Sequence, residues 1–420
     1  MGSNESAKTH SGGKKYLLER VQKHAKDFPF KPALVWVNAK GQDEQSYTYA
    51  QFLDASRRLA VELLKEGLKR GDTAVLAYTP GLDFYVAFWA CMEAGIIAVP
   101  VNPPFSNSDV KKFLRIVNNS NARVLLTDKL FARLVTMKIR KHKAKQIGKG
   151  LVSMFGRNSN TKTFTFGDLE SLWWITTSGM SSNQENVSLE PQPVEDTAFI
   201  MYSSGSTSAP KGALTSMVNL QHQFDLIEQA LESSPEHVCT WWAPHFHDFG
   251  LISGFLNSLN QGCKAVITSP MYFIQRPALW LDMMHNHKAT HTFGPDFGYL
   301  LLVNKTTQEE REVETWDLSH LKVAMSAAEK VRYATLKAFT DAFAPCGFRP
   351  ETFCPAYGLA EHAVGVTINS LKSLPQVLNV HRTELESDGE VVTNSSEDDA
   401  EATRLKQLVG SGTAWNETDV

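Results

Sequence analysis

One stretch of the sequence, residues 198–212, constrains the fold and the chemistry of this chain more than any other. It reads AFIMYSSGSTSAPKG: an apolar run typical of a β-strand stops in small and hydroxylated residues, and Pro-Lys-Gly follows. Small side chains let several backbone N–H groups converge on one anion, while hydroxyls and a lysine add donors and positive charge. The stretch therefore predicts a phosphate-binding loop after a strand, formed by Ser203, Ser204, Gly205, Ser206, Thr207 and Lys211.

Two other interpretations of this stretch are weaker. A Walker A loop reads GxxxxGK followed by Ser or Thr, and the spacing here differs. Ser/Gly-rich composition is also typical of flexible linkers. A linker, however, needs neither an apolar strand before it nor a Pro-Lys-Gly sequence after it. We therefore interpret the stretch as a binding loop.

The length and composition of the chain limit its class. At 420 residues it exceeds one ordinary core, so we expect two or more subdomains around a shared cleft. A net charge of −3 gives no overall attraction to nucleic acid or to an anionic membrane. The five scattered cysteines form no CxxC pair, which argues against a disulfide framework and favours the cytoplasm. No uninterrupted apolar run is long enough for a transmembrane segment.

Short apolar strands alternate with helical patterns along the chain, which predicts an α/β fold with largely parallel sheets. We expect a disordered tail over residues 1–13, whose M-G-x-x-x-S start fits a myristoylation pattern on Gly2, although a cloning remnant or a chance match explains it more simply. A first α/β subdomain is predicted over 14–190 and a second, with the phosphate loop, over 191–367. Residues 368–420 read as a polar insertion and the start of another subdomain. The basic stretch at 138–149 has no apolar periodicity and predicts a solvated loop.

A second polar motif follows a predicted strand at residues 241–255, WWAPHFHDFGLISGF. A strand that ends in Pro, His and Asp before a glycine-containing helix is typical of the polar rim of a substrate pocket. We therefore predict that His247 contacts a substrate carboxylate. Several side chains here and further along are metal ligands by residue type, but neither group has the HExxH spacing and zinc is disfavoured. They are His245, His247 and Asp248, and then His285, His287 and His291.

Together these motifs resemble the adenylate-forming superfamily, and most closely its fatty acyl-AMP ligase branch. The resemblance rests on the loop at 198–212, then HDFGLISG, SPMYFIQRPALWLDMM, KATHTFGPDFGYLL and FAPCGFRPETFCPAYGLAEHAVG, in that order. It implies a layered αβαβα large domain with two subdomains around a cleft. It also implies the activation of a fatty acid to an acyl-adenylate, with ATP and Mg²⁺, for transfer to an acyl carrier protein or a polyketide or peptide synthase module.

The resemblance assigns roles to individual residues. Lys211 and the loop hydroxyls would hold the β- and γ-phosphates, and Thr207 and Glu361 would hold magnesium. Tyr357 would stack on adenine, which Gly358 lets the backbone approach closely. Ala327 and Ala328, in the SAAEK stretch, would lie along the base. His247, Lys211 and Glu361 are thus the expected catalytic residues, although Glu361 is also consistent with a solvated helix residue or cap.

The sequence also departs from the family pattern. Ser208 replaces a common glycine of the phosphate loop, and Ser326, Ala327 and Lys330 replace Asn, Gly and Pro of the usual NGAEP. The chain ends before the family's C-terminal domain, whose lysine contacts the reacting carboxylate. We therefore expect the isolated chain to be weakly active or inactive. Two alternatives stay open: an acyl-CoA synthetase, and a catalytically silent module that binds acyl groups or nucleotides.

Overall fold

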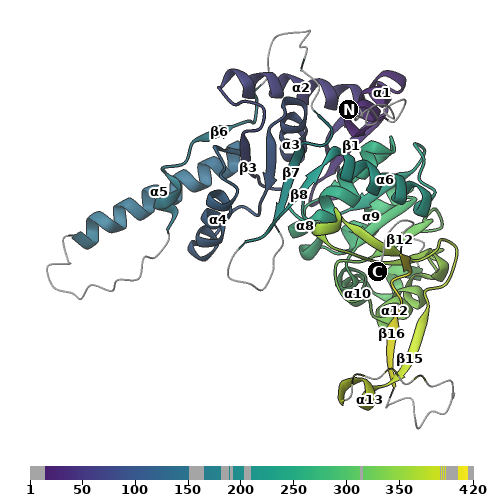
Figure 1. Cartoon of the computed structure of the whole chain (residues 1–420). Helices are drawn as coiled ribbons and strands as arrows, with labels where there is room; N and C mark the ends of the chain where they lie inside the picture. The colour runs from purple at the N-terminus through teal and green to yellow at the C-terminus, as the bar shows by residue number, and fades with distance from the viewer. Residues whose placement is uncertain are drawn as a thin grey trace, which may run out of the picture.

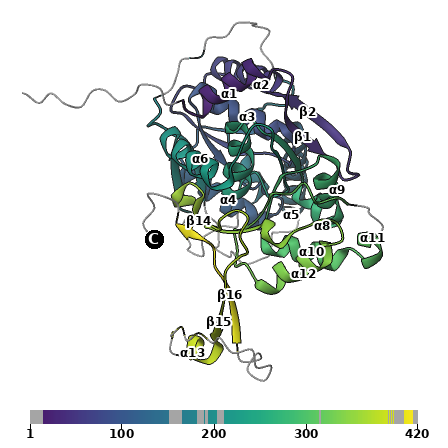
Figure 2. The ribbon, with the colours of Figure 1, turned by 90° about the vertical axis from the view of Figure 1, so that its right-hand side faces the viewer.

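The structure, a computed structural model, describes residues 15–150, 165–180, 189, 193–202, 210–312, 316–387, 389, 391, 393 and 405–414. The side chains at 142 and 145–150 are not described. Two large β-sheets, of six and nine strands, form the body, and a two-stranded hairpin extends away from it (Figures 1 and 2).

The six-stranded sheet is parallel over five strands, and its last strand pairs antiparallel. Its strands are short and almost wholly apolar, as expected for a sheet covered on both faces. In spatial order they are β6 (Trp174–Thr176), β5 (Val124–Thr127), β3 (Thr73–Ala77), β4 (Ile97–Pro100), β7 (Thr197–Tyr202) and β8 (Gly212–Ser216).

The nine-stranded sheet has a parallel centre of six strands and antiparallel strands at both edges. The antiparallel pairs are β1–β2 at one edge and β13–β14–β17 at the other. In spatial order the strands are β17 (Thr413–Ala414), β14 (Gly365–Ile368), β13 (Phe353–Gly358), β12 (Val323–Ser326), β11 (His291–Gly294), β9 (Val238–Trp241), β10 (Lys264–Thr268), β1 (Pro32–Val37) and β2 (Asp43–Thr48).

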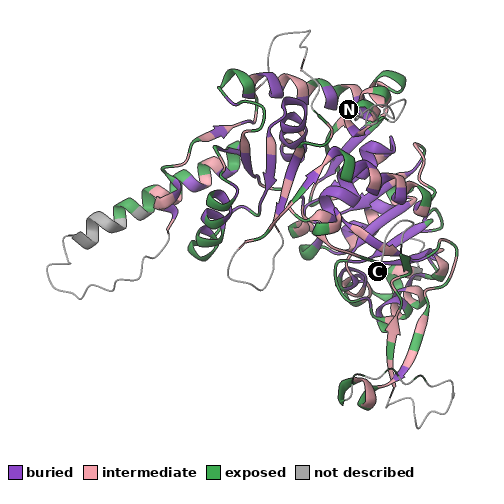
Figure 3. Ribbon diagram, viewed as in Figure 1, coloured by how far each residue is buried: buried purple, intermediate pink, exposed green. Residues whose placement is uncertain are grey.

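Helices cover both sheets and fill the space between them. A continuous apolar core joins the facing sides of the two sheets through α2, α3, α6 and η2, and three further apolar clusters pack against the strands. Figure 3 shows the buried residues concentrated in these strands and in α3. The layers confirm the predicted αβαβα fold. The longer helices are α1 (Leu17–Asp27), α2 (Tyr49–Lys65), α3 (Leu82–Ala94), α4 (Asn107–Asn119), α5 (Lys129–Gly150), α6 (Met217–Leu231), α9 (Ala278–Asn286), α10 (Asp296–Lys305) and α12 (Tyr333–Phe343).

The remaining helices are short and lie mainly at the ends of strands. η2 is a π-helix, a form that is frequent at functional sites. These helices are η1 (Phe166–Leu169), η2 (Phe249–Leu256), α7 (Asn257–Asn260), α8 (Pro270–Gln275), α11 (Gln308–Glu312), η3 (Pro350–Thr352), η4 (Ala360–His362) and α13 (Arg382–Ser387). Within the described ranges, no helix combines the length and the apolar character that crossing a membrane requires.

The sheets exchange strands across the boundary predicted at 190/191. β1 and β2 come from the first third of the chain but complete the nine-stranded sheet, and β7 and β8 lie beyond the boundary but complete the six-stranded one. The predicted limits of the subdomains stay a prediction, but the hydrogen-bonded sheets do not follow them. No local pattern in the sequence indicates which distant strands pair.

Two predicted loops contain regular structure. The basic stretch at 138–149 belongs to α5, because Lys and Arg are good helix formers even without an apolar stripe. The polar insertion carries β15 (Val377–His381) and β16 (Leu405–Val409), which pair antiparallel over five residues. This hairpin, with α13 beside it, points away from the body (Figure 2). The predicted tail 1–13 lies outside the described residues.

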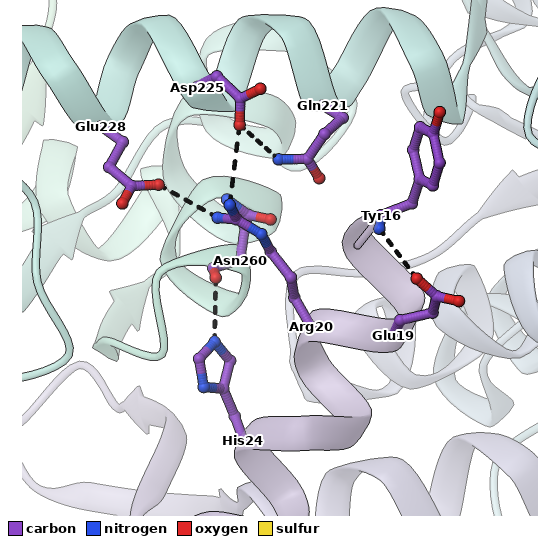
Figure 4. Close-up of polar contacts among 8 residues, drawn as sticks. All are labelled: Tyr16, Glu19, Arg20, His24, Gln221, Asp225, Glu228 and Asn260. Atoms are coloured by element: carbon purple, nitrogen blue, oxygen red, sulfur yellow. Dashed lines mark hydrogen bonds and ion pairs between the residues drawn. The ribbon is translucent and has the colours of Figure 1, made fainter. Parts of the chain in front are cut away.

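The N-terminal helix α1 ties two internal helices together (Figure 4). The guanidinium of Arg20 lies 3.1 Å from Glu228 and 3.8 Å from Asp225, both on α6. One turn later, the ring nitrogen Nε2 of His24 lies 3.0 Å from the backbone oxygen of Asn260, at the end of α7. α1 therefore fixes α6 relative to α7, and both helices line the cavity described below.

Candidate functional site

A cavity of about 500 Å³ opens where the two sheets meet. Much of its lining lies at the carboxyl ends of parallel strands or in the residues that follow them: β4 and β7 in one sheet, and β11, β12, β13 and the segment after β9 in the other. Ligands of open α/β sheets bind at this edge, because the loops after the strands converge there. The topology thus places the motifs that follow these strands around one space.

Six of the predicted site residues line this cavity, although they come from three separate motifs. Lys211 is described, but its side chain is exposed and is not part of the lining. The predicted loop residues Ser203, Ser204, Gly205, Ser206 and Thr207, and the altered Ser208, lie outside the described residues. The six lining residues are His247, Ala327, Ala328, Tyr357, Gly358 and Glu361.

His247 is oriented by its neighbour. Its ring nitrogen Nδ1 lies 2.6 Å from Oδ1 of Asp248, and hydrogen bonding to this carboxylate raises the pKa of His247. The same carboxylate accepts a 2.7 Å bond from the backbone N–H of Phe249 and so caps η2. Since Nδ1 is engaged by Asp248, Nε2 is the ring nitrogen left to meet a ligand. The protonated ring would donate a hydrogen bond from Nε2 to an anionic group.

His245, two residues earlier, has a different role. It is buried, its ring lies 4.1 Å from that of Phe84 between centroids, and burial lowers its pKa to about 3. A histidine in these surroundings is neutral and packs as part of the core. Among the described residues, no group of three or more His, Cys, Asp or Glu side chains is placed to hold a metal ion.

The AYGLAE motif forms the rim of the cavity. Tyr357 is 52% exposed, so its ring is accessible beside the cavity. At Gly358, a Cβ would lie 1.6 Å from the backbone oxygen of Val364, which leaves no room for any side chain. Close backbone approach therefore requires glycine here. Glu361, three residues later in η4, is exposed and lines the same space.

A strained turn at Ala363 brings the backbones of Gly358 and Val364 together. Ala363 has φ 61° and ψ −39°, and the N–H of Val364 donates to the backbone oxygen of His362 at 2.8 Å. This geometry is close to a classic γ-turn, which is rare and strained, and such strain is concentrated at functional sites. It returns the chain into β14 and places the Val364 oxygen against Gly358. The local sequence, HAVG, gives no signal for such a turn.

The SAAEK stretch after β12 is also strained and is held by a side chain. Ala328 has φ 68°, in the left-handed region that alanine rarely adopts. Oε1 of Glu329 accepts a 2.7 Å bond from the backbone N–H of Phe297, near the start of α10. In the same corner, buried Asp296 binds Arg332 and Thr335. Glu329 thus anchors the stretch, a role that the sequence alone did not indicate.

The cavity contains polar atoms suited to a ligand. The hydroxyl of Thr367, on β14, is buried in the lining without a hydrogen-bond partner among the described residues. An unpaired buried hydroxyl next to an accessible tyrosine ring and an exposed carboxylate fits a nucleotide, which offers a flat base and polar sugar and phosphate atoms. Glu361 supplies the oxygen ligands that Mg²⁺ prefers.

This arrangement defines a layered α/β protein with a ligand site at the shared carboxyl edge of two sheets. The sequence model of the family described as AMP-binding enzyme matches residues 21–394. The chain belongs to this family, which confirms the resemblance drawn from its motifs. Its relatives include fatty acid ligases that act on acyl carrier proteins and solved fatty acyl-AMP ligases.

Three similar proteins illustrate this relationship. A medium-chain-fatty-acid–[acyl-carrier-protein] ligase from Moorena producens is 30% identical over 360 residues, covering 85% of this chain and 56% of the relative. A 4-hydroxyphenylalkanoate adenylyltransferase from Mycobacterium marinum is 30% identical over 408 residues, covering 95% of this chain and 60% of the relative. A fatty acyl-adenylate ligase from L. pneumophila was solved with acyl adenylate and pyrophosphate. It matches with a TM-score of 0.80 at 30% identity, and the match covers 95% of this chain and 64% of the relative. The chain thus spans roughly three fifths of the length of these proteins.

Proposed function

We propose that the protein containing this chain activates a fatty acid to an acyl-adenylate, with ATP and Mg²⁺, and passes the acyl group to a carrier protein in the cytoplasm. The observation that carries the proposal is the convergence of His247, Ala328, Tyr357 and Glu361, from three motifs at three strand ends, on one cavity. The lining also includes the buried apolar residues Ile227 and Leu231 of α6 and Phe249 of η2, which suit an acyl chain.

In this proposal the polar rim positions the reacting groups. Asp248 raises the pKa of His247 and so favours the protonated ring, whose Nε2 would donate to one oxygen of the substrate carboxylate. The other oxygen attacks the α-phosphorus of ATP; a new P–O bond forms as the bond to pyrophosphate breaks, and pyrophosphate leaves. Holding the carboxylate and the α-phosphate in line can supply much of the rate enhancement of this kind of reaction.

The remaining residues would bind the nucleotide. The ring of Tyr357 would stack on adenine, with the backbones of Ala327, Ala328 and Gly358 alongside it. Glu361, with Thr207 from the phosphate loop, would hold magnesium, which neutralises phosphate charge when it is bound. Ser203, Ser204, Gly205, Ser206 and Lys211 would bind the phosphates, and this assignment rests on the sequence motif alone.

The names of the relatives support the partner and the compartment. The ligase from Moorena producens acts, by its name, on an acyl carrier protein, so we propose the same kind of acceptor here. All five cysteines are free and buried, as is usual in a reducing compartment. Relatives from Mycobacterium bovis and from two strains of Mycobacterium tuberculosis, however, share the name putative fatty-acid–CoA ligase FadD21. The proposal therefore needs a direct comparison of acyl acceptors with the full-length protein.

A binding measurement on this chain tests the proposal first. Acylsulfamoyl adenosines, which mimic the acyl-adenylate without reacting, are titrated in a thermal unfolding assay. A site filled at a hundred times its dissociation constant adds about 2.7 kcal/mol to the free energy of unfolding. We expect stabilisation that grows with acyl length and is absent with adenosine and fatty acid added separately at the same concentrations. No stabilisation by any analogue would contradict the proposal.

A further inference from the structure

The buried part of the cavity contains a polar side chain for which an alkyl chain offers no partner. Asn257, the first residue of α7, lines the cavity and is 4% exposed. Its side-chain oxygen Oδ1 has no hydrogen-bond partner among the described residues. A buried amide oxygen left unpaired is costly in free energy. Its partner must therefore come from the cavity, as a ligand group or as water.

The position of Asn257 sets which part of a substrate it meets. Phe249, Ser253 and Asn257 follow one another at intervals of four residues along η2 and α7, so they share one face of this helix, and all three line the cavity. All three are buried, whereas the side chain of His247 at the start of the helix is half exposed. Ten helical residues span at most about 15 Å. A chain whose carboxylate lies at His247 therefore meets Asn257 with its distal part.

Building on the proposed function, we propose that the acid activated here carries a hydroxyl group on the distal part of its chain, and that Asn257 binds this hydroxyl. A hydroxyl both donates and accepts hydrogen bonds, so it satisfies either orientation of the amide. Ile227 and Leu231 of α6 supply apolar wall to the same cavity. Ser253, one turn before Asn257, adds a hydroxyl as a second polar group on this face.

The combination of apolar side chains with the unpaired amide of Asn257 makes the cavity selective between hydroxylated and plain acyl chains. A site that hydrogen-bonds a substrate hydroxyl discriminates against an analogue that lacks it, because the buried protein group is then left without a partner. A plain alkyl chain would fill the same volume but leave Asn257 unpaired. Asn257 is therefore proposed as a specificity-determining residue, with no part in the chemical step.

The test compares matched ligands. Two series of acylsulfamoyl adenosines, from hexanoyl to dodecanoyl, carry either an unsubstituted chain or a terminal hydroxyl, and calorimetry gives their dissociation constants. For its preferred length, the wild-type chain is expected to bind the hydroxylated analogue at least about tenfold more tightly. Asn257→Leu, which is close in size and apolar, is expected to remove or reverse this preference.

A neighbouring residue provides a matched control. Asn260 lies on the same short helix, is buried, and also has unpaired side-chain atoms, but it is not part of the cavity lining. Asn260→Leu is expected to keep the wild-type preference. In the ligand-free protein, Asn257→Leu is expected to leave the unfolding temperature unchanged or to raise it, because it removes an unpaired buried amide. The wild-type comparison decides the matter even if a variant fails to fold.

The possible outcomes are distinct. If the unsubstituted analogue binds as tightly as its hydroxylated partner at every length, the inference is overturned while the proposed function stands. If Asn257→Leu keeps the preference, the assignment to Asn257 is wrong. If neither series binds, the proposed function fails, and the inference that depends on it fails as well.

Discussion

The two ends of the cavity are built by different means. At the rim, Tyr357 and Glu361 are exposed, and the backbone is strained at Ala328 and Ala363. At the inner end, Ile227 and Leu231 are buried on the regular α-helix α6. Strained backbone persists only where surrounding structure holds it, and it is concentrated at functional sites. We infer that the rim positions the reacting groups. The inner end packs like the protein core and selects the acyl chain by its shape and by the polar group of Asn257.

The largest effect is expected where the strained backbone is most crowded. Gly358→Ala places a methyl group 1.6 Å from the backbone oxygen of Val364, and neither backbone is free to move. We expect a loss of about 4 kcal/mol or more in the free energy of unfolding, measured by urea denaturation. Gly410→Ala is the control, since its Cβ meets ordinary contacts of 3.6 Å and beyond. Equal stability of the two variants would show that the rim is looser than the structure indicates.

A pair of truncations separates the two ends directly. Leu231→Ala at the inner end removes buried apolar contacts and is expected to cost about 2 to 3 kcal/mol in the free energy of unfolding. Tyr357→Ala at the rim removes a half-exposed ring and is expected to change stability by less than about 0.5 kcal/mol. Binding of an acylsulfamoyl adenosine should weaken about tenfold in Tyr357→Ala, through lost base stacking. Unchanged affinity in that variant would argue against stacking on Tyr357.

The smallest effect concerns the pair that orients the substrate. The folded-state pKa of His247 is raised by Asp248, so the pair contributes stability that is present below the unfolded pKa, near 6.5, and is lost as the pH rises through the folded pKa. Asp248→Asn keeps an oxygen for capping η2 but loses the charge. The stability difference between wild type and this variant should therefore be larger at pH 6 than at pH 9, in urea titrations at both values.

The control for this pH dependence removes the titrating ring. In a His247→Gln background, the stability difference caused by Asp248→Asn should not depend on pH between these values. A difference that grows with pH in the wild-type background would contradict the assigned direction of the pKa shift.

The alternation of apolar strands and helical patterns was enough to predict the α/β class, because burial on both faces of a parallel sheet imposes a local apolar run on each strand. The motifs at 241–255 and 356–361 were likewise recognisable, since each lies within a few residues of a strand end. That they meet around one cavity was an expectation of the resemblance, and the cavity lining shows it for the residues described. The solvated loop predicted at 138–149 was wrong because helix propensity without an apolar stripe leaves no periodicity to detect.

Sequence by itself thus determined the elements and the chemical types available at their ends: a tyrosine and a glutamate after one strand, a histidine and an aspartate after another. Only the tertiary structure decided how they combine. Gln223 on α6 holds the chain after the γ-turn through Gly365, and Glu329 anchors the SAAEK stretch to Phe297. The amide of Asn257 is left unpaired by its buried surroundings. Such contacts are fixed by packing of the whole fold, and no local pattern of residues encodes them.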